Sequence, residues 1–115
     1  MALEAKFIGR EYGPLTYEIG KEKIKEYAKA IKNEDPHYMD EDFAKGTKYG
    51  GIIAPPPFAV VYAGMLAEPF FFDKELDLNL FMLVHGEQEF EFLEVVRPGD
   101  VITSKATITH IENKE

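Results

Sequence analysis

The segment from Asn33 to Tyr38 brings together side chains that could hold and move a proton. It reads Asn-Glu-Asp-Pro-His-Tyr, so an amide, a carboxylate, an imidazole and a phenol lie within one short stretch. A carboxylate and an imidazole held close together are a common pair for general acid–base catalysis. The candidate catalytic residues are therefore Asn33, Asp35, His37 and Tyr38.

An apolar stretch follows this polar one. Residues 50–58 read Gly-Gly-Ile-Ile-Ala-Pro-Pro-Pro-Phe and lead into an uncharged run that extends to Ala67. A polar loop beside an apolar helix could bind an acyl-type ligand, with its polar end in the loop and its chain along the helix. The candidate substrate-binding residues are Ile53, Ala54, Pro55, Pro56, Phe58, Tyr62 and Met65.

Acidic residues occur in two groups that could suggest a metal, at 87, 89 and 91 and at 35 and 40–42. The first group lacks histidines at a spacing suited to zinc. The second lacks the spaced oxygen ligands and the glycine of a calcium-binding loop. We expect no metal and no cofactor.

The proton-transfer candidates lie in a long connection that follows a predicted helix. Residues 21–32 place Ile24, Tyr27, Ala28 and Ile31 on one face, which predicts an amphipathic helix. Pro36 prevents its continuation much beyond Asn33. Within the connection at 33–57, residues 40–44 predict a single helical turn, and a loop of this length inside one domain is usually functional.

The next predicted helix starts at Pro57 and is apolar on every face through Leu66, which predicts burial within protein. Residues 14–19 predict a short strand, and residues 80–95 predict a half-buried strand because Glu87 begins an acidic–aromatic alternation. Residues 97–100 predict a turn, followed by a strand at 101–111. The predicted fold class is α+β, with an antiparallel sheet wrapped around a central helix.

The composition predicts one domain over residues 1–115, with 21 acidic residues against 13 basic ones. This acidic balance disfavours nucleic acid and anionic membranes as partners. Three prolines interrupt the uncharged run, so we expect no membrane span. Without a signal-like apolar segment at the N-terminus, we expect a cytoplasmic protein.

Three motifs together resemble the MaoC-like (R)-3-hydroxyacyl hydratase/dehydratase superfamily: residues 51–58, residues 85–90 and the Arg-Pro-Gly-Asp turn at 97–100. The chain is most similar to the non-catalytic half, including one subunit of the mycobacterial-type 3-hydroxyacyl-carrier-protein dehydratases. The resemblance implies a hot-dog fold that binds acyl thioesters, attached to coenzyme A or to an acyl carrier protein. It also implies pairing with a second hot-dog, as a homodimer or a heterodimer. Two long strands cannot cover a helix that is apolar all round, so we expect the last strand or strands to be missing, or supplied by another chain.

Catalytic members of that superfamily carry a loop of the type Gly-Asp-x-Asn-Pro-x-His. When this motif is aligned on Pro36, Asn33 stands at the aspartate, Asp35 at the asparagine and Tyr38 at the histidine, whereas His37 lies one residue early. An amide cannot accept a proton at working pH, and a phenol with a pKa of about 10 is a poor base.

The triple proline at 55–57 also has no N–H groups that could polarise a thioester carbonyl, so such donors would have to come from Ala54 or from Phe58 onward. The resemblance, with these departures, therefore implies a subunit of an (R)-specific enoyl-thioester hydratase or 3-hydroxyacyl-thioester dehydratase of fatty acyl metabolism. A partner would supply the catalytic Asp and His. A self-sufficient hydratase that uses His37 with Asp35, and an acyl-thioester binding module without turnover, remain alternatives.

Overall fold

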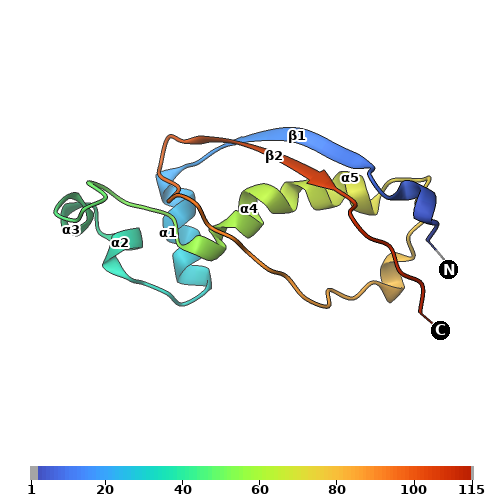
Figure 1. The fold of residues 1–115 in the computed structure, drawn as a ribbon. Coiled ribbons are helices and arrows are strands. Elements are labelled where there is room, and N and C mark those ends of the chain that lie inside the picture. The colour runs from blue at the N-terminus through green and yellow to red at the C-terminus, as the bar shows by residue number, and fades with distance from the viewer. Residues whose placement is uncertain (1–2, 115) are drawn as a thin grey trace.

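A two-stranded antiparallel sheet arches over a run of short helices in the computed structural model, which describes residues 3–114 (Figure 1). Strand β1 spans Glu11–Glu18 and strand β2 spans Val101–Thr107, with Glu11 opposite Thr107 and Glu18 opposite Val101. The register shifts between Tyr12 and Leu15. Gly13 lies in this bulge with φ +94°, where a Cβ would approach the carbonyl oxygen of Ser104 to 2.8 Å. The strands predicted at 14–19 and 101–111 are confirmed as β1 and β2, although β1 begins earlier and β2 ends earlier than predicted.

The helix predicted from Pro57 is a segmented helical run that continues to Phe71. It consists of η2 (Pro56–Phe58), α4 (Ala59–Ala63), η3 (Gly64–Leu66) and α5 (Ala67–Phe71). Prolines near its start and within α5 remove N–H donors, which accounts for short segments in place of one regular helix. The prediction that this helix is buried on every face is wrong. Phe58 and Leu66 are buried, but Val60 and Met65 are exposed.

Three further helices lie at one end of the molecule (Figure 1). Helix α1 (Lys21–Ala30) confirms the amphipathic prediction and buries Ile24 and Ala28. The connection after it holds α2 (Pro36–Met39) and α3 (Glu41–Lys45), which are capped by the side chains of Asp35 and Asp40. The predicted turn at 40–44 is thus confirmed as α3, whereas α2 was not predicted.

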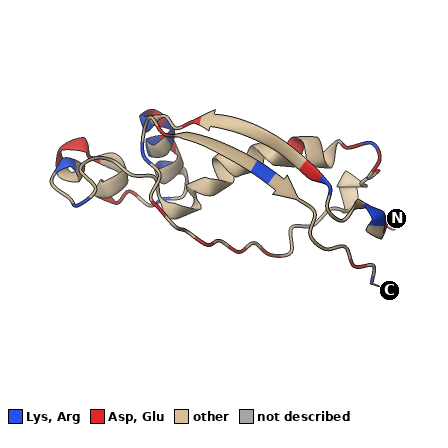
Figure 2. Ribbon diagram, turned by 45° about the horizontal axis from the view of Figure 1, so that its top comes forward, with Lys and Arg blue, Asp and Glu red and all other residues tan. Residues whose placement is uncertain are grey.

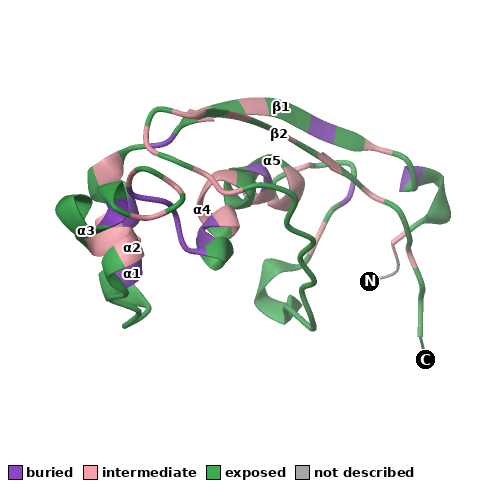
Figure 3. Ribbon diagram, turned by 60° about the vertical axis from the view of Figure 1, so that its left-hand side comes forward, coloured by how far each residue is buried: buried purple, intermediate pink, exposed green. Residues whose placement is uncertain are grey.

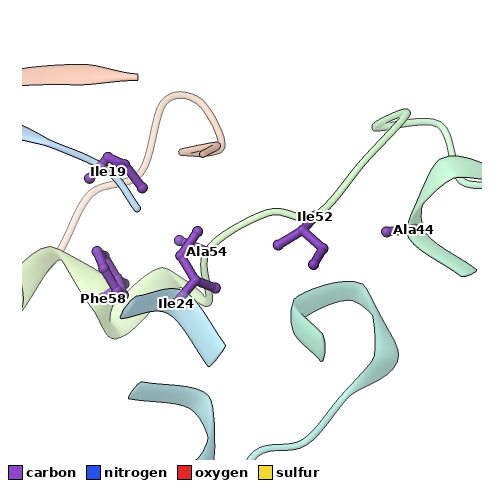
Figure 4. Packing of buried hydrophobic residues seen from close by; sticks show 6 residues of the cluster. All are labelled: Ile19, Ile24, Ala44, Ile52, Ala54 and Phe58. Atoms are coloured by element: carbon purple, nitrogen blue, oxygen red, sulfur yellow. The ribbon is translucent and has the colours of Figure 1, made fainter. Parts of the chain in front are cut away.

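Two hydrophobic clusters form the core. The larger joins the end of β1, α1, α3 and the start of the helical run, and consists of Ile19, Ile24, Ala44, Ile52, Ala54 and Phe58 (Figure 4). The smaller lies at the other end, where η1 (Ala5–Phe7) meets β1 and the helical run, and consists of Phe7, Tyr12, Leu66 and Leu76. The predicted turn at 97–100 is confirmed, and it is joined to the larger cluster by two hydrogen bonds of 2.8 Å between Ile19 and residues 99 and 100.

The prediction of a half-buried strand at 80–95 is wrong. The segment contains η4 (Leu80–Met82) followed by extended backbone without a strand ladder, and most of it is exposed (Figure 3). Phe81 and Leu93 are 101% and 87% exposed. A strand needs a neighbour for its N–H and C=O groups, and none of the described residues pairs with this segment. None of the described helices has the length and apolar character needed to span a membrane.

Candidate functional site

Asp35 and His37 form a close pair at the start of α2. The carboxylate Oδ1 of Asp35 accepts a hydrogen bond from the backbone N–H of His37 at 2.9 Å and lies 2.6 Å from the imidazole Nδ1. The hydrogen bond from the His37 N–H, followed by the imidazole contact, lowers the pKa of the Asp35 carboxyl. A carboxylate with a lowered pKa is a weaker base, and here it both caps the helix and orients the ring.

The imidazole of His37 packs against two aromatic rings. Its centroid lies 5.1 Å from that of Phe43 and 6.2 Å from that of Tyr49, both edge-on. Tyr49 in turn lines a cavity beside the start of the helical run. The structure therefore brings Asp35 and His37 near this cavity, which the neighbouring Tyr49 lines and His37 does not.

Asn33 lies apart from this pair. It follows Lys32, which adopts φ 58° beyond the end of α1, and its backbone N–H donates to the carbonyl of Ala28 at 2.9 Å. Asn33 is exposed and does not line the cavity. Asn33 thus terminates α1 through its backbone N–H. The catalytic role of its side chain stays a prediction.

The cavity itself has a volume of about 350 Å³ and lies between the start of the helical run and the extended segment at 92–96. Its walls contain six of the seven predicted binding residues, namely Ile53, Ala54, Pro55, Pro56, Phe58 and Tyr62. Met65 does not contribute to the wall and is 45% exposed. A mostly apolar space of this size suits a small acyl group.

Three tyrosines line the cavity, namely Tyr38, Tyr49 and Tyr62. Burial raises the pKa of Tyr38, and the neighbouring charges of Asp35 and Tyr49 raise it further. Burial also raises the pKa of Tyr62. Both phenols therefore stay protonated at neutral pH, where they can donate hydrogen bonds to a carbonyl but cannot act as bases.

The backbone N–H groups at the start of the helical run are already engaged. Ala54 donates to the carbonyl of Val96 at 2.8 Å, and Phe58 donates to that of Pro55 at 2.9 Å. The N–H of Ala59 is directed to the carbonyls of Pro56 and Pro57. Neither Ala54 nor Phe58 therefore offers a free donor that could stabilise an oxyanion.

The sequence did not point to the opposite wall of the cavity. Tyr49, Ala59 and residues 92–96 also line it. The sequence predicted a strand that ends at residue 95, and only the folded chain shows that the following Val96 accepts a hydrogen bond from Ala54. A metal site is absent from the part of the chain that the structure describes, in which no three His, Cys, Asp or Glu residues cluster suitably.

Residues 6–115 match the family described as FAS1-like, dehydratase domain region. A UPF0336 protein of Streptomyces avermitilis is 40% identical over 98% of this chain and 76% of its own length. A UPF0336 protein of Saccharopolyspora erythraea is also 40% identical, over 98% of this chain and 71% of its own length.

Solved structures share the same arrangement of sheet and helices. The C-terminally truncated HadBC (3R-hydroxyacyl-ACP dehydratase) complex of Mycobacterium tuberculosis superposes with a TM-score of 0.82 at 25% identity, covering 96% of this chain and 81% of that chain. The (R)-hydratase from A. caviae superposes with a TM-score of 0.69 at 17% identity, covering 91% of this chain and 74% of that chain. The MaoC-like dehydratase of Rhodospirillum rubrum superposes with a TM-score of 0.67 at 20% identity, covering 94% of this chain and 70% of that chain. The resemblance to MaoC-like proteins is confirmed: this chain has the α+β hot-dog fold and belongs to the FAS1-like dehydratase domain family.

Proposed function

We propose that this chain is the acyl-binding subunit of an (R)-specific enoyl-thioester hydratase or 3-hydroxyacyl-thioester dehydratase of fatty acyl metabolism. The acyl group of a coenzyme A or acyl-carrier-protein thioester would enter the cavity beside the helical run. A second hot-dog subunit would supply the aspartate and histidine that add or remove water. The reaction needs no cofactor, because water addition requires only a general base and acid.

The cavity is the observation that carries this proposal. Its walls are largely apolar, and the phenols of Tyr38 and Tyr62 in them stay protonated at neutral pH. No aspartate or histidine lines it, and Glu94 is its one carboxylate among the described residues. Together with the engaged N–H groups of Ala54 and Phe58, these features favour binding over chemistry.

The contact of 2.6 Å between His37 and Asp35 favours a second candidate, a self-sufficient hydratase. In that case His37 would act as the base and Asp35 would orient its ring. His37 does not itself line the cavity, although its ring packs edge-on against that of Tyr49, which does, so the imidazole would have to come closer to the bound thioester.

A crotonyl thioester assay separates the two candidates. The loss of absorbance on hydration is followed for this chain alone, and again with a hot-dog subunit that carries an intact Gly-Asp-x-Asn-Pro-x-His loop. Binding of the saturated butyryl thioester is measured by calorimetry. We expect binding by this chain alone and hydration only in the mixture.

The variant His37→Ala is compared with His110→Ala, which removes an exposed imidazole at the opposite end of the molecule. Activity of the single chain that is lost in His37→Ala but kept in His110→Ala would establish the second candidate. Binding without turnover in either setting would indicate a binding module. Absence of thioester binding would overturn the proposal.

A further inference from the structure

The three tyrosine hydroxyls in the cavity wall have no hydrogen-bond partner among residues 3–114. Elsewhere in the chain, the hydroxyl of Tyr12 donates to a carboxylate and that of Tyr27 to a carbonyl. No such bond joins the hydroxyls of Tyr38, Tyr49 and Tyr62 to the described chain. A phenol hydroxyl is a donor as well as an acceptor, so each of the three can donate to a bound molecule.

Packing against the larger cluster holds two of these tyrosines, which come from different helices. Tyr38 lies in α2, and α2 is joined to the cavity wall because the N–H of Ile53 donates to the carbonyl of His37 at 3.2 Å. Tyr62 lies in α4, one helical turn after Phe58, and the centroids of these two rings are 6.2 Å apart. Both tyrosines are half-buried and contact the larger cluster, so their rings are positioned by the core.

The third tyrosine is held by exposed groups. The Nζ of Lys48 lies 5.2 Å from the centroid of the Tyr49 ring, and the guanidinium of Arg97 donates to the Tyr49 carbonyl. Both of these cationic side chains are exposed, and Tyr49 is not among the residues that pack against the larger cluster. A binding group acts best when its own position is locked by packing, which favours Tyr38 and Tyr62 over Tyr49 as donors.

A thioester carbonyl that enters this cavity needs hydrogen-bond donors, because burial of an unpaired carbonyl oxygen costs free energy. The N–H groups of Ala54 and Phe58 are engaged with other carbonyls, and the prolines between them have none. Residues 49–67 contain no Lys, Arg, Asp or Glu and are tan in Figure 2, so this wall has no charged donor. Among the described wall residues, the tyrosines supply the uncharged side-chain donors, whereas an ionised carboxylate such as that of Glu94 only accepts.

We propose that the hydroxyls of Tyr38 and Tyr62 donate hydrogen bonds to the carbonyl oxygen of the bound acyl thioester, in place of the backbone N–H groups that are engaged elsewhere. A carbonyl oxygen has two lone pairs and can accept both bonds. The cavity then recognises the thioester group as well as its apolar chain, and it selects a thioester over a thioether of the same length. This assignment rests on the proposed acyl binding and names the side chains that fix the polar end of the ligand.

Two ligands that differ only at the carbonyl test the proposal on the full chain. Butyryl pantetheine is a thioester, and butyl pantetheine is the thioether that has a methylene in place of the carbonyl. Pantetheine is the part that coenzyme A and an acyl carrier protein share, so the test does not depend on the carrier. The Kd of each ligand is measured by calorimetry, and we expect the thioester to bind at least about fivefold more tightly.

The double variant Tyr38→Phe/Tyr62→Phe keeps both rings and removes both hydroxyls. It should weaken thioester binding, leave thioether binding unchanged, and bring the two Kd values within about twofold of each other. Tyr17→Phe is the matched control, because Tyr17 is also half-buried against the larger cluster but does not line the cavity, and it should keep the preference. Infrared spectra of an isotope-labelled thioester carbonyl should show a band at lower wavenumber in the complex, and this shift should be lost in the double variant. A purely structural role of the rings would not move that band.

The possible results separate this assignment from the proposed acyl binding. Equal Kd values of the two ligands for the unaltered chain would overturn the assignment alone, since the apolar chain would still be bound. A preference that persists in the double variant, or that is lost in Tyr49→Phe instead, would overturn the roles of Tyr38 and Tyr62. Binding of neither ligand would overturn the proposed acyl binding together with the assignment.

Discussion

At the scale of single residues, Asp35 has two roles that depend on one oxygen atom. Its Oδ1 accepts the N–H of His37 at the start of α2 and contacts the imidazole Nδ1 of the same residue. Both interactions stabilise the ionised carboxylate, and so the pKa of Asp35 is lower than in the unfolded chain. Because the folded pKa is lowered, the stabilisation is present above the unfolded pKa of about 3.9 and is lost as the pH falls through the folded pKa.

The variant Asp35→Asn should therefore lower the melting temperature at pH 7, and the difference from the unaltered chain should shrink as the pH falls below about 4. Thermal unfolding followed by circular dichroism across this pH range measures the difference. The control Glu34→Gln removes a neighbouring exposed carboxylate for which the structure shows no side-chain hydrogen bond or ion pair. Equal melting temperatures for Asp35→Asn and the unaltered chain at pH 7 would contradict the prediction.

A second residue-level prediction concerns Tyr12, which is buried and donates a hydrogen bond of 2.7 Å to the carboxylate of Asp73. Arg10 also donates to Asp73, at 3.0 Å, so β1 is tied to the loop after α5. The variant Tyr12→Phe should lower the melting temperature by several degrees, because a hydrogen bond to a charged group is lost in a small domain. Tyr17→Phe is the control, since the structure shows no hydrogen bond from the Tyr17 hydroxyl and it lies on the same strand. A Tyr12→Phe melting temperature no lower than that of Tyr17→Phe would show that the Asp73 bond contributes little.

At the scale of elements, the start of the helical run positions both the core and the cavity. Phe58 is 1% exposed, packs edge-on against Tyr27 at 5.4 Å between ring centroids, and also lines the cavity. The hydroxyl of Tyr27 donates to the carbonyl of Pro57 at 3.1 Å, which ties α1 to the same turn. The start of the helical run is thus attached to α1 through the contacts of Tyr27 with Pro57 and Phe58.

The variant Phe58→Ala should reduce the free energy of unfolding by about 3–5 kcal/mol, because a fully buried aromatic ring is lost from the larger cluster. Urea denaturation measures this change. Phe72→Ala, which truncates a ring that is 67% exposed just after α5, should cost far less. Similar losses for the two variants would mean that the larger cluster does not depend on Phe58.

At the scale of the whole molecule, the cavity depends on segments that are far apart in the sequence. Ile53 to Tyr62 form one wall and residues 92–96 the other, held together where Ala54 donates to the carbonyl of Val96. The cavity therefore forms only when these two segments meet in the folded chain.

If the cavity binds acyl chains, the Kd of saturated acyl thioesters should fall about fourfold for each added methylene, because each buried methylene contributes about 0.8 kcal/mol. The variant Ala59→Trp places an indole ring in the cavity from α4, so the Kd should stop falling at a shorter acyl chain than in the unaltered protein. Ala63→Trp adds the same ring at an exposed position of the same helix and should leave the series unchanged. Calorimetry across chain lengths measures the series, and a Kd that does not depend on chain length would contradict the proposal.

The sequence alone determined the elements whose signals are local. The spacing of Ile24 and Ala28 indicated α1, and Arg97 to Asp100 indicated the turn before β2, because helical periodicity and turn chemistry depend on neighbouring residues. The motifs at 51–58, 85–90 and 97–100 indicated the family for the same reason. Six of the seven predicted binding residues line the cavity because they are consecutive or lie one helical turn apart.

Only the tertiary structure decided what depends on contacts between distant segments. The alternation at 87–92 is that of a strand, but a strand forms only where another strand supplies hydrogen bonds, and no described segment does so. The opposite wall at 92–96 and the place of Tyr49 beside His37 likewise follow from chain packing, since residues that meet across a cavity share no local pattern. The sequence thus specified the side chains of the loop at 33–38, while the fold placed Asn33 away from the cavity, Tyr38 in its wall and the Asp35–His37 pair near it.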